Sequence, residues 1–214
     1  EGADAGWGRS TVALVTSGGF GAAYSGTSHS VSASVIAGEG TSMERDYDYS
    51  SVRFVKDLED AAIIGRQAGE RAVRRLNPRK VKSGPTPVIF DPRVSNGLLG
   101  HLAGSVNGAA VARGTSFLRD KMDEKIFAEG IVIVDDPHRK AGLASRPFDG
   151  EGVANRRMNL VEDGRLITWL LDTATGHQLG MKSTGHASRG ASSPPSPSCS
   201  NLYMEPGTQT PGAL

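Results

Sequence analysis

The sequence predicts a fold that combines antiparallel β-strands with a few helices, and three observations support this. Residues 11–49 contain strand-like segments separated by short glycine turns, which is typical of an antiparallel meander. Residues 57–76 repeat apolar and small side chains close to a 3.6-residue period, as an amphipathic helix does. Residues 160–169 place Asp163-Gly164 between two short apolar runs, which is a β-hairpin signal.

The meander is expected to follow a loop over residues 1–10. Its strands have β-branched or alternating apolar character and cover residues 11–16, 20–37 and 42–49. In the second strand Val31, Ala33 and Val35 share one face and serines occupy the other, so we expect a half-exposed sheet.

The amphipathic helix is predicted to run from Asp57 to Leu76. Asp57 is a suitable N-cap, and arginines near the end suit the negative C-terminus of a helix dipole. Asn77-Pro78 follows and predicts that the helix ends there, because the residue before a proline disfavours helical backbone.

The stretch Pro92–Ser116 organises the second half of the chain. It follows a short apolar segment, Val88–Phe90, that we expect to be a buried strand. A turn at Asp91-Pro92 then leads into a short helix, whose apolar face consists of Leu98, Leu99, Leu102 and Val106. Glycines at 97, 100, 104 and 108 weaken this helix and allow close backbone packing.

The rest of the chain alternates short elements with loops. The expected elements are one or two helical turns at 117–122, a strand at 130–134, the hairpin at 160–169, a helix at 172–179 and an apolar segment at 202–204. A long polar loop begins at Asp135-Asp136, and loops of this length often carry function.

Composition limits the classes of function. The formal net charge of +1 gives no electrostatic basis for direct nucleic-acid binding, and there is no apolar run that could span a membrane. The single cysteine, Cys199, rules out an internal disulfide and a site with several thiolates, and it fits a reducing compartment. We therefore expect a soluble protein, and a chain that begins at Glu1 reads as a piece of a longer one.

His101 is the first candidate for chemistry, and it could be a ligand, a base or a packed polar residue. A zinc-peptidase helix needs two histidines on one face and an adjacent glutamate to activate water. Ser105 stands one turn after His101, and serine is a poor zinc ligand, so a structural histidine is the favoured reading.

Acidic residues and Arg146 are further candidates. Asp135, Asp136, Asp149 and Glu151 could gather oxygen ligands or form an acid/base pair, although strand-end and turn chemistry is the favoured explanation. Arg146 could bind a peptide carboxylate bidentately, or it could tie Asp149 to the loop. Ser188 and Cys199 lack the sequence context of a nucleophile.

Several separated motifs together resemble one family. In order they are PVIFDPRVSNGLLGHLAGSVNGAAVARGTSFL, IVIVDDP, RPFDGEGV, LITWLLD, LGMKSTGHASRG and NLYMEPG. They are similar to the TldD/PmbA (TldE) family, once called modulators of DNA gyrase. The resemblance implies an α+β fold with a largely antiparallel, barrel-like β-sheet and a few packed helices. It also implies a cytoplasmic, heterodimeric peptidase that acts on unfolded peptides.

The resemblance also identifies which subunit type to expect. In TldD-type subunits a zinc signature, His-Glu-x-x-x-His, falls near the positions that are Gly100, His101 and Ser105 here. Those subunits also have a cysteine ligand much further on, which we expect to lie outside this chain. This chain supplies none of the three, so it looks like the PmbA/TldE-type partner, with no catalytic or metal residues of its own and zinc in the TldD-like subunit. Candidate substrate or interface contacts are His101, Asn107, Arg113, Arg146, Asp149 and Glu151.

Residues 1–214 then read as a partial C-terminal domain of a PmbA/TldE-like protein, truncated at both ends. Two other functions remain open. The chain could itself be a metallopeptidase, with His101, Asp149 or Glu151 binding metal, or it could be a regulator of DNA gyrase, as the older family name suggests.

Overall fold

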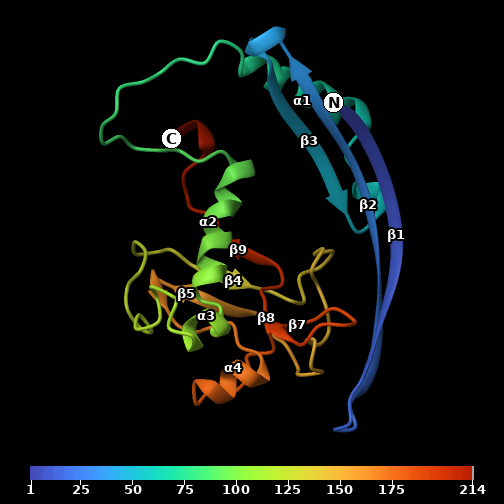
Figure 1. Ribbon diagram of the computed structural model, residues 1–214, viewed down its shortest axis with the longest axis vertical. Coiled ribbons are helices and arrows are strands. Elements are labelled where there is room, and N and C mark those ends of the chain that lie inside the picture. Colours follow the sequence, from blue (N-terminus) through green and yellow to red (C-terminus); the bar gives the residue numbers. More distant parts are fainter. Residues whose placement is uncertain (214) are drawn as a thin grey trace. The chain divides into compact units, whose positions relative to one another are not determined.

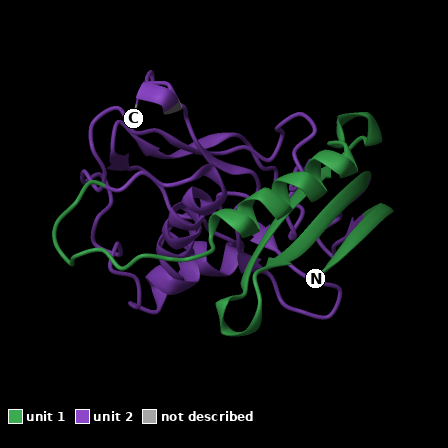
Figure 2. Cartoon of the chain, turned by 90° about the horizontal axis from the view of Figure 1, so that it is seen from above, with its two compact units in different colours: residues 1–12, 25–87 green, residues 13–24, 88–214 purple. Residues whose placement is uncertain are grey.

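The computed structural model describes residues 1–213, and the chain falls into two compact units (Figure 2). Unit 1 contains residues 1–12 and 25–87. Unit 2 contains residues 13–24 and the chain from residue 88 onward. Each unit has its own sheet and its own buried side chains.

Unit 1 is built on a three-stranded sheet in the order β1-β2-β3 (Figure 1). The strands are β1 (Gly2–Val15), β2 (Gly21–Ala37) and β3 (Glu44–Val52), with a 3₁₀ turn, η1 (Gly40–Ser42), between the last two. The predicted antiparallel meander is confirmed, and β2 pairs with β3 from His29 opposite Val52 to Ala37 opposite Glu44. The loop expected over residues 1–10 is wrong, because pairing with β2 makes this glycine-rich segment a strand.

Helix α1 (Ala61–Arg74) packs on β3 through Ile64, Ala68 and Ala72, which are fully buried. The predicted cap at Asp57 is wrong. Asp57 ends a separate 3₁₀ turn, η2 (Val55–Asp57), and Asp60 caps α1 by accepting a hydrogen bond from the Ala62 amide at 2.8 Å.

The contact between α1 and β3 includes ion pairs. Asp46 and Asp48 are buried on the face of β3 that packs against α1. Arg71 lies 2.6 Å from Asp48, and Arg75 lies 3.6 Å from Asp46. The opposite face of β3 presents Tyr47 and Tyr49, which are half exposed and stacked on each other.

Unit 2 combines short helices with two small antiparallel sheets. The helices are α2 (Pro92–Ser105), α3 (Gly108–Ala112), α4 (Thr173–Gln178) and a 3₁₀ turn, η3 (Pro211–Ala213). One sheet has the order β6-β5-β4-β9, formed by β4 (Ile133–Asp135), β5 (Met158–Glu162), β6 (Arg165–Leu166) and β9 (Leu202–Met204). The other pairs β7 (Ala187–Ser188) with β8 (Ser196–Pro197).

The α+β class and the antiparallel pairing are therefore confirmed. Within residues 1–213 the sheets are open, so the barrel-like closure that the resemblance implied is not present in this part of the chain. None of the helices over the same residues has the length and apolar character that a membrane crossing requires.

The hydrophobic core of unit 2 joins α2 and α3 to the four-stranded sheet. Leu102 and Val106, from α2 and its C-cap, pack with Leu160 and with Trp169 to Leu171. The predicted apolar face of the helix is confirmed at Leu102 and Val106, whereas Leu98 is half exposed. Burial of these large side chains is the main force that fixes α2 on the sheet.

Several expected boundaries in unit 2 need correction. The buried strand expected at 88–90 is wrong, because Val88, Ile89 and Phe90 form no strand and are 63%, 65% and 49% exposed. Residues 117–122 form turns and no helix, and the strand expected at 130–134 is β4, at 133–135. The predicted hairpin is confirmed, and Asp163 and Gly164 adopt the positive φ values, 48° and 76°, that such a turn requires.

Of the four glycines predicted to permit close packing, only Gly108 has close neighbours. A Cβ atom there would lie 2.6 Å from Leu171 Cδ2 and 2.8 Å from the Leu170 carbonyl oxygen. Gly97, Gly100 and Gly104 face open space. Gly108 is thus where α3 approaches the sheet too closely for a side chain.

We predict opposite effects of alanine at two of these glycines. Gly108→Ala should lower the free energy of unfolding by about 1–3 kcal/mol, because a methyl group overpacks the contact. Gly104→Ala should raise it by up to about 1 kcal/mol, because alanine favours the helix and meets no neighbour. Urea unfolding of both variants measures this, and equal effects would contradict the assigned contact.

Candidate functional site

Helix α2 carries the positions that the resemblance links to zinc. Asp91 caps the helix by accepting a hydrogen bond from the Arg93 amide at 2.9 Å, and His101 and Gly100 are exposed further along it. Ser105 Oγ donates to the His101 carbonyl oxygen at 2.8 Å, so its hydroxyl is used within the helix. One imidazole without an adjacent carboxylate or second histidine does not fit a zinc-peptidase site. Among residues 1–213 we find no group of three or more His, Cys, Asp or Glu side chains arranged to hold a metal.

Asn107 and Arg113 lie at the two ends of α3. Asn107 caps the helix by accepting from the Ala109 amide at 2.9 Å, and its Nδ2 donates to the Pro197 carbonyl oxygen at 2.7 Å. Arg113 is exposed at the C-cap. Asn107 therefore joins α3 to β8, and the expectation that either residue contacts substrate stays a prediction.

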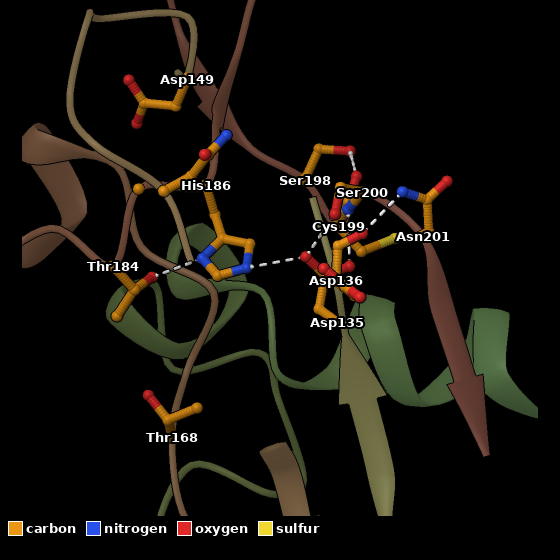
Figure 3. Close-up of polar contacts among 12 residues, drawn as sticks. Asp135, Asp136, Asp149, Thr168, Thr184, His186, Ser198, Cys199, Ser200 and Asn201 are labelled. Carbon is orange, nitrogen blue, oxygen red and sulfur yellow. Dashed lines mark hydrogen bonds and ion pairs between the residues drawn. The ribbon is translucent and has the colours of Figure 1, made fainter. Parts of the chain in front are cut away.

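Asp135, at the end of β4, is the centre of a buried polar network (Figure 3). Its carboxylate accepts from the amide and the hydroxyl of Ser200, both at 2.6 Å, and lies 3.2 Å from His186 Nε2. His186 Nδ1 in turn lies 2.8 Å from Thr184 Oγ1. Asp135 is fully buried and His186 is 2% exposed. The network links three segments that are far apart in the sequence.

Asp149 and Glu151 have structural partners of their own. Asp149 is buried, and its carboxylate accepts from the amides of Glu151, Val153 and Ala187 at 2.8–3.1 Å. Glu151 Oε2 accepts from the amide and hydroxyl of Thr173 at 2.8 and 2.7 Å, at the start of α4. Asp149 thus fixes a turn, and Glu151 holds the start of α4.

Asp136 and Asn201 fix the start of the long loop. Asp136 Oδ1 accepts from the His138 amide at 2.9 Å, and Asn201 Nδ2 donates to the Asp136 carbonyl oxygen at 2.6 Å. Asn201 also bonds Ser145 Oγ at 2.9 Å. The loop is therefore tied to the residues just before β9.

Arg146 lies in this loop with two nitrogen atoms that lack a hydrogen-bond partner in the protein. Its backbone is fixed, since its amide donates to the Pro137 carbonyl oxygen and its carbonyl oxygen accepts from Asn155 Nδ2. Its side-chain Nε and Nη2 are buried and unpaired, as is Oδ1 of Asn159 on β5. The tie between Arg146 and Asp149 that the sequence left open is not formed, because Asp149 bonds backbone amides instead.

Two charged side chains, Asp135 and Arg146, affect the pKa of the Cys199 thiol. Partial burial, and next the nearby Asp135 carboxylate, raise the pKa of its thiol, while Arg146 acts weakly in the opposite direction. A thiol with a raised pKa is a poor nucleophile at neutral pH, which agrees with the sequence-based view of Cys199.

His186, Thr184 and Ser200 were not among the candidates from the sequence. His186 and Thr184 sit inside the motif LGMKSTGHASRG, and Ser200 directly precedes NLYMEPG. No spacing relates them to Asp135, because the contacts join residues 51 and 65 positions apart. The motifs include the segments that carry these residues, but only the folded structure shows that the segments contact one another.

Comparison with protein families matches both units. Residues 3–76 match the model of the PmbA/TldA metallopeptidase central domain, and residues 83–214 match that of the PmbA/TldA metallopeptidase C-terminal domain. The chain belongs to the PmbA/TldD metallopeptidase family. The sequence motifs had suggested one C-terminal segment over residues 1–214, whereas the family models divide the chain between two domains.

Relatives agree with this assignment. The chain is 43% identical over 164 residues to metalloprotease PmbA of Escherichia coli O157:H7, which covers 77% of this chain and 36% of that protein. A crystal structure from Bacteroides thetaiotaomicron, named as a candidate modulator of DNA gyrase, has a TM-score of 0.86 at 32% identity, covering 96% of this chain and 44% of that one. TldE of Thermococcus kodakarensis shares the fold, with a TM-score of 0.86 at 24% identity over 98% of this chain and 48% of that one. The chain thus spans less than half of each of these proteins.

We predict that Cys199 reacts slowly with alkylating agents in the folded protein. Because burial and Asp135 raise the pKa of the thiol, less thiolate is present at pH 8 than in the unfolded chain. The rate of reaction with iodoacetamide, followed by mass spectrometry, should rise when urea unfolds the protein and also in Asp135→Asn. Equal rates in the folded and unfolded states would contradict the assigned environment.

Proposed function

We propose that this chain is part of a zinc-less subunit in a TldD/TldE-like metallopeptidase, which pairs with a TldD-like subunit and holds unfolded peptide for cleavage. The observation that carries the proposal is the set of side chains that α2 presents. Gly100, His101 and Ser105 occupy the positions of the zinc signature, and they offer one exposed imidazole and a hydroxyl already bonded to the helix backbone.

Membership of a metallopeptidase family supports the general activity. The role of this chain within it follows from the chemistry of the side chains. Zinc peptidases need ligands and a carboxylate that activates water, and α2 provides neither in the required pattern. The remaining contribution of such a chain is to complete the enclosure and to bind peptide, with zinc in the partner and the complex in the cytoplasm.

The polar loops of unit 2 support a binding role. Asp135, Asp149 and Glu151 use their carboxylates to hold backbone in place, and they order a loop region that has little regular secondary structure. Rigid loops on a packed sheet are a common way to present peptide-binding groups.

The test compares the full-length protein that contains this chain with its complex with a TldD-like subunit. Alone, we expect it to purify without stoichiometric zinc and to leave an unstructured peptide intact. The complex should cleave the peptide and lose activity with a chelator. Stoichiometric zinc and chelator-sensitive cleavage by the protein alone would instead identify it as a peptidase itself.

One variant tests whether the chain lacks peptidase activity only because α2 lacks zinc ligands. Gly100→His, His101→Glu and Ser105→His together restore the zinc signature, and Gly100 faces open space, so α2 should remain folded. We expect no zinc-dependent cleavage by this variant of residues 1–214, because the family signature needs a further cysteine ligand. Robust cleavage would contradict the proposed role. Circular dichroism of the variant confirms that it is folded.

A further inference from the structure

The guanidinium of Arg146 contains buried polar atoms of unit 2 that the proposed function has not used. Its Nε and Nη2 atoms are both buried and have no hydrogen-bond partner in the protein. Leaving charged donors buried and unpaired is costly, because they lose their hydration without compensation. Native structures therefore usually pair such groups with an anion or with ordered water, and neither atom has such a partner within the protein.

The two free atoms are the pair that recognises a carboxylate. The Nε and Nη2 hydrogens of a guanidinium point in nearly the same direction, so one carboxylate can accept both in a side-on, bidentate arrangement. A lysine or a single hydroxyl cannot reproduce this geometry.

Neighbouring acids of the chain are already engaged elsewhere. Asp149 accepts from three backbone amides, and Asp135 accepts from Ser200 and lies against His186. Asp135 and Arg146 both affect the pKa of the Cys199 thiol, so the buried acid lies in the same region as the guanidinium. The carboxylate of Asp135 nevertheless bonds Ser200 and His186 and not Arg146. No change of rotamer at Asp149 or Asp135 supplies a partner without breaking these bonds.

The position of Arg146 also suits a ligand that arrives from outside. The residue is only half-buried overall and is followed by exposed Pro147, so part of Arg146 reaches the surface although Nε and Nη2 do not. Its backbone is held at both the amide and the carbonyl, which fixes the origin of the side chain. A side chain that recognises a ligand specifically needs a fixed backbone position and donor atoms without another partner.

We propose that Arg146 binds a carboxylate of the peptide substrate through Nε and Nη2. The inference rests on the proposed peptide-binding role and adds the chemical group that is recognised. Two sources share this chemistry, the terminal carboxylate of the peptide and an aspartate or glutamate side chain. The experiment distinguishes them.

The experiment measures binding of labelled peptides to the full-length protein in its complex, with chelator present to stop cleavage. Three forms of one unstructured peptide are compared: a free terminal carboxylate, a terminal amide, and a terminal amide with one internal glutamate. The free acid should bind roughly 10- to 100-fold more tightly than the neutral amide, as expected for a charge-assisted bidentate contact. Tight binding of the glutamate form would assign the site to side-chain carboxylates, and weak binding would assign it to the terminus.

Arg146→Gln should abolish the difference between the acid and amide forms, and Arg146→Lys should retain only part of it. Arg156→Gln is the matched control, because Arg156 is an exposed arginine of the same loop, and it should keep the full difference. Circular dichroism and urea unfolding establish that the variants fold. If Arg146→Gln does not fold, competition of acetate against the acid peptide on the unaltered protein decides the question.

Equal binding of all three peptides would overturn the proposal, as would a preference for the acid that survives Arg146→Gln. A crystal structure of the acid-peptide complex with only ordered water on Nε and Nη2 would also overturn it. Peptide binding without discrimination leaves the proposed function intact and removes only this inference. No peptide binding in any form would contradict both.

Discussion

The buried carboxylate of Asp135 is the interaction on which the candidate site depends most. A carboxylate with no exposed surface is costly to desolvate, and it is stable only when donors surround it. Asp135 obtains them from Ser200 and His186, which belong to segments that follow it by 65 and 51 residues. The need for donors thus brings the end of β4, the residue before β7 and the approach to β9 into one place. Asp149 acts in the same way on a smaller scale, where three backbone amides surround one side chain.

Local patterns in the sequence were sufficient for elements that depend on short-range interactions. The β2–β3 alternation, the hairpin at Asp163-Gly164 and the short helix expected at 172–179 all involve neighbours in the chain, and all are present. Some errors occurred where distant partners decide, whereas the expected cap at Asp57 was a local error, since Asp60 caps α1 instead. The first ten residues form a strand only because β2 pairs with them, and Val88 to Phe90 is exposed although its composition is that of a buried strand. Similarly, Asp135-Asp136 looked like an ordinary strand end, because nothing near it in sequence indicates that Ser200 and His186 provide its partners.

The function is likewise inferred from two kinds of observation, local sequence motifs and contacts between residues far apart in the sequence. Motifs spread along the chain were enough to identify the family, since each is recognisable by itself. The proposed role within the family rests on α2, which presents one exposed imidazole at His101, and on loops whose order comes from buried carboxylates. Arg146 illustrates what the sequence left undecided. Its two alternatives were a carboxylate ligand and a tie to Asp149, and the second is not formed, because the Asp149 carboxylate accepts from three backbone amides instead.

The most direct measurement of this account compares the free energy of unfolding of Asp135→Ala and Asp136→Ala in urea. Asp135→Ala should lower it by about 3–5 kcal/mol, because the buried His186 and the half-buried Ser200 amide lose their acceptor. Asp136→Ala removes a single contact with the His138 amide and should cost only about 1 kcal/mol. Hydrogen exchange at the Ser200 amide should accelerate in the first variant and stay slow in the second. Losses of similar size in the two variants, or an unchanged exchange rate at Ser200, would contradict the central role of the Asp135 carboxylate.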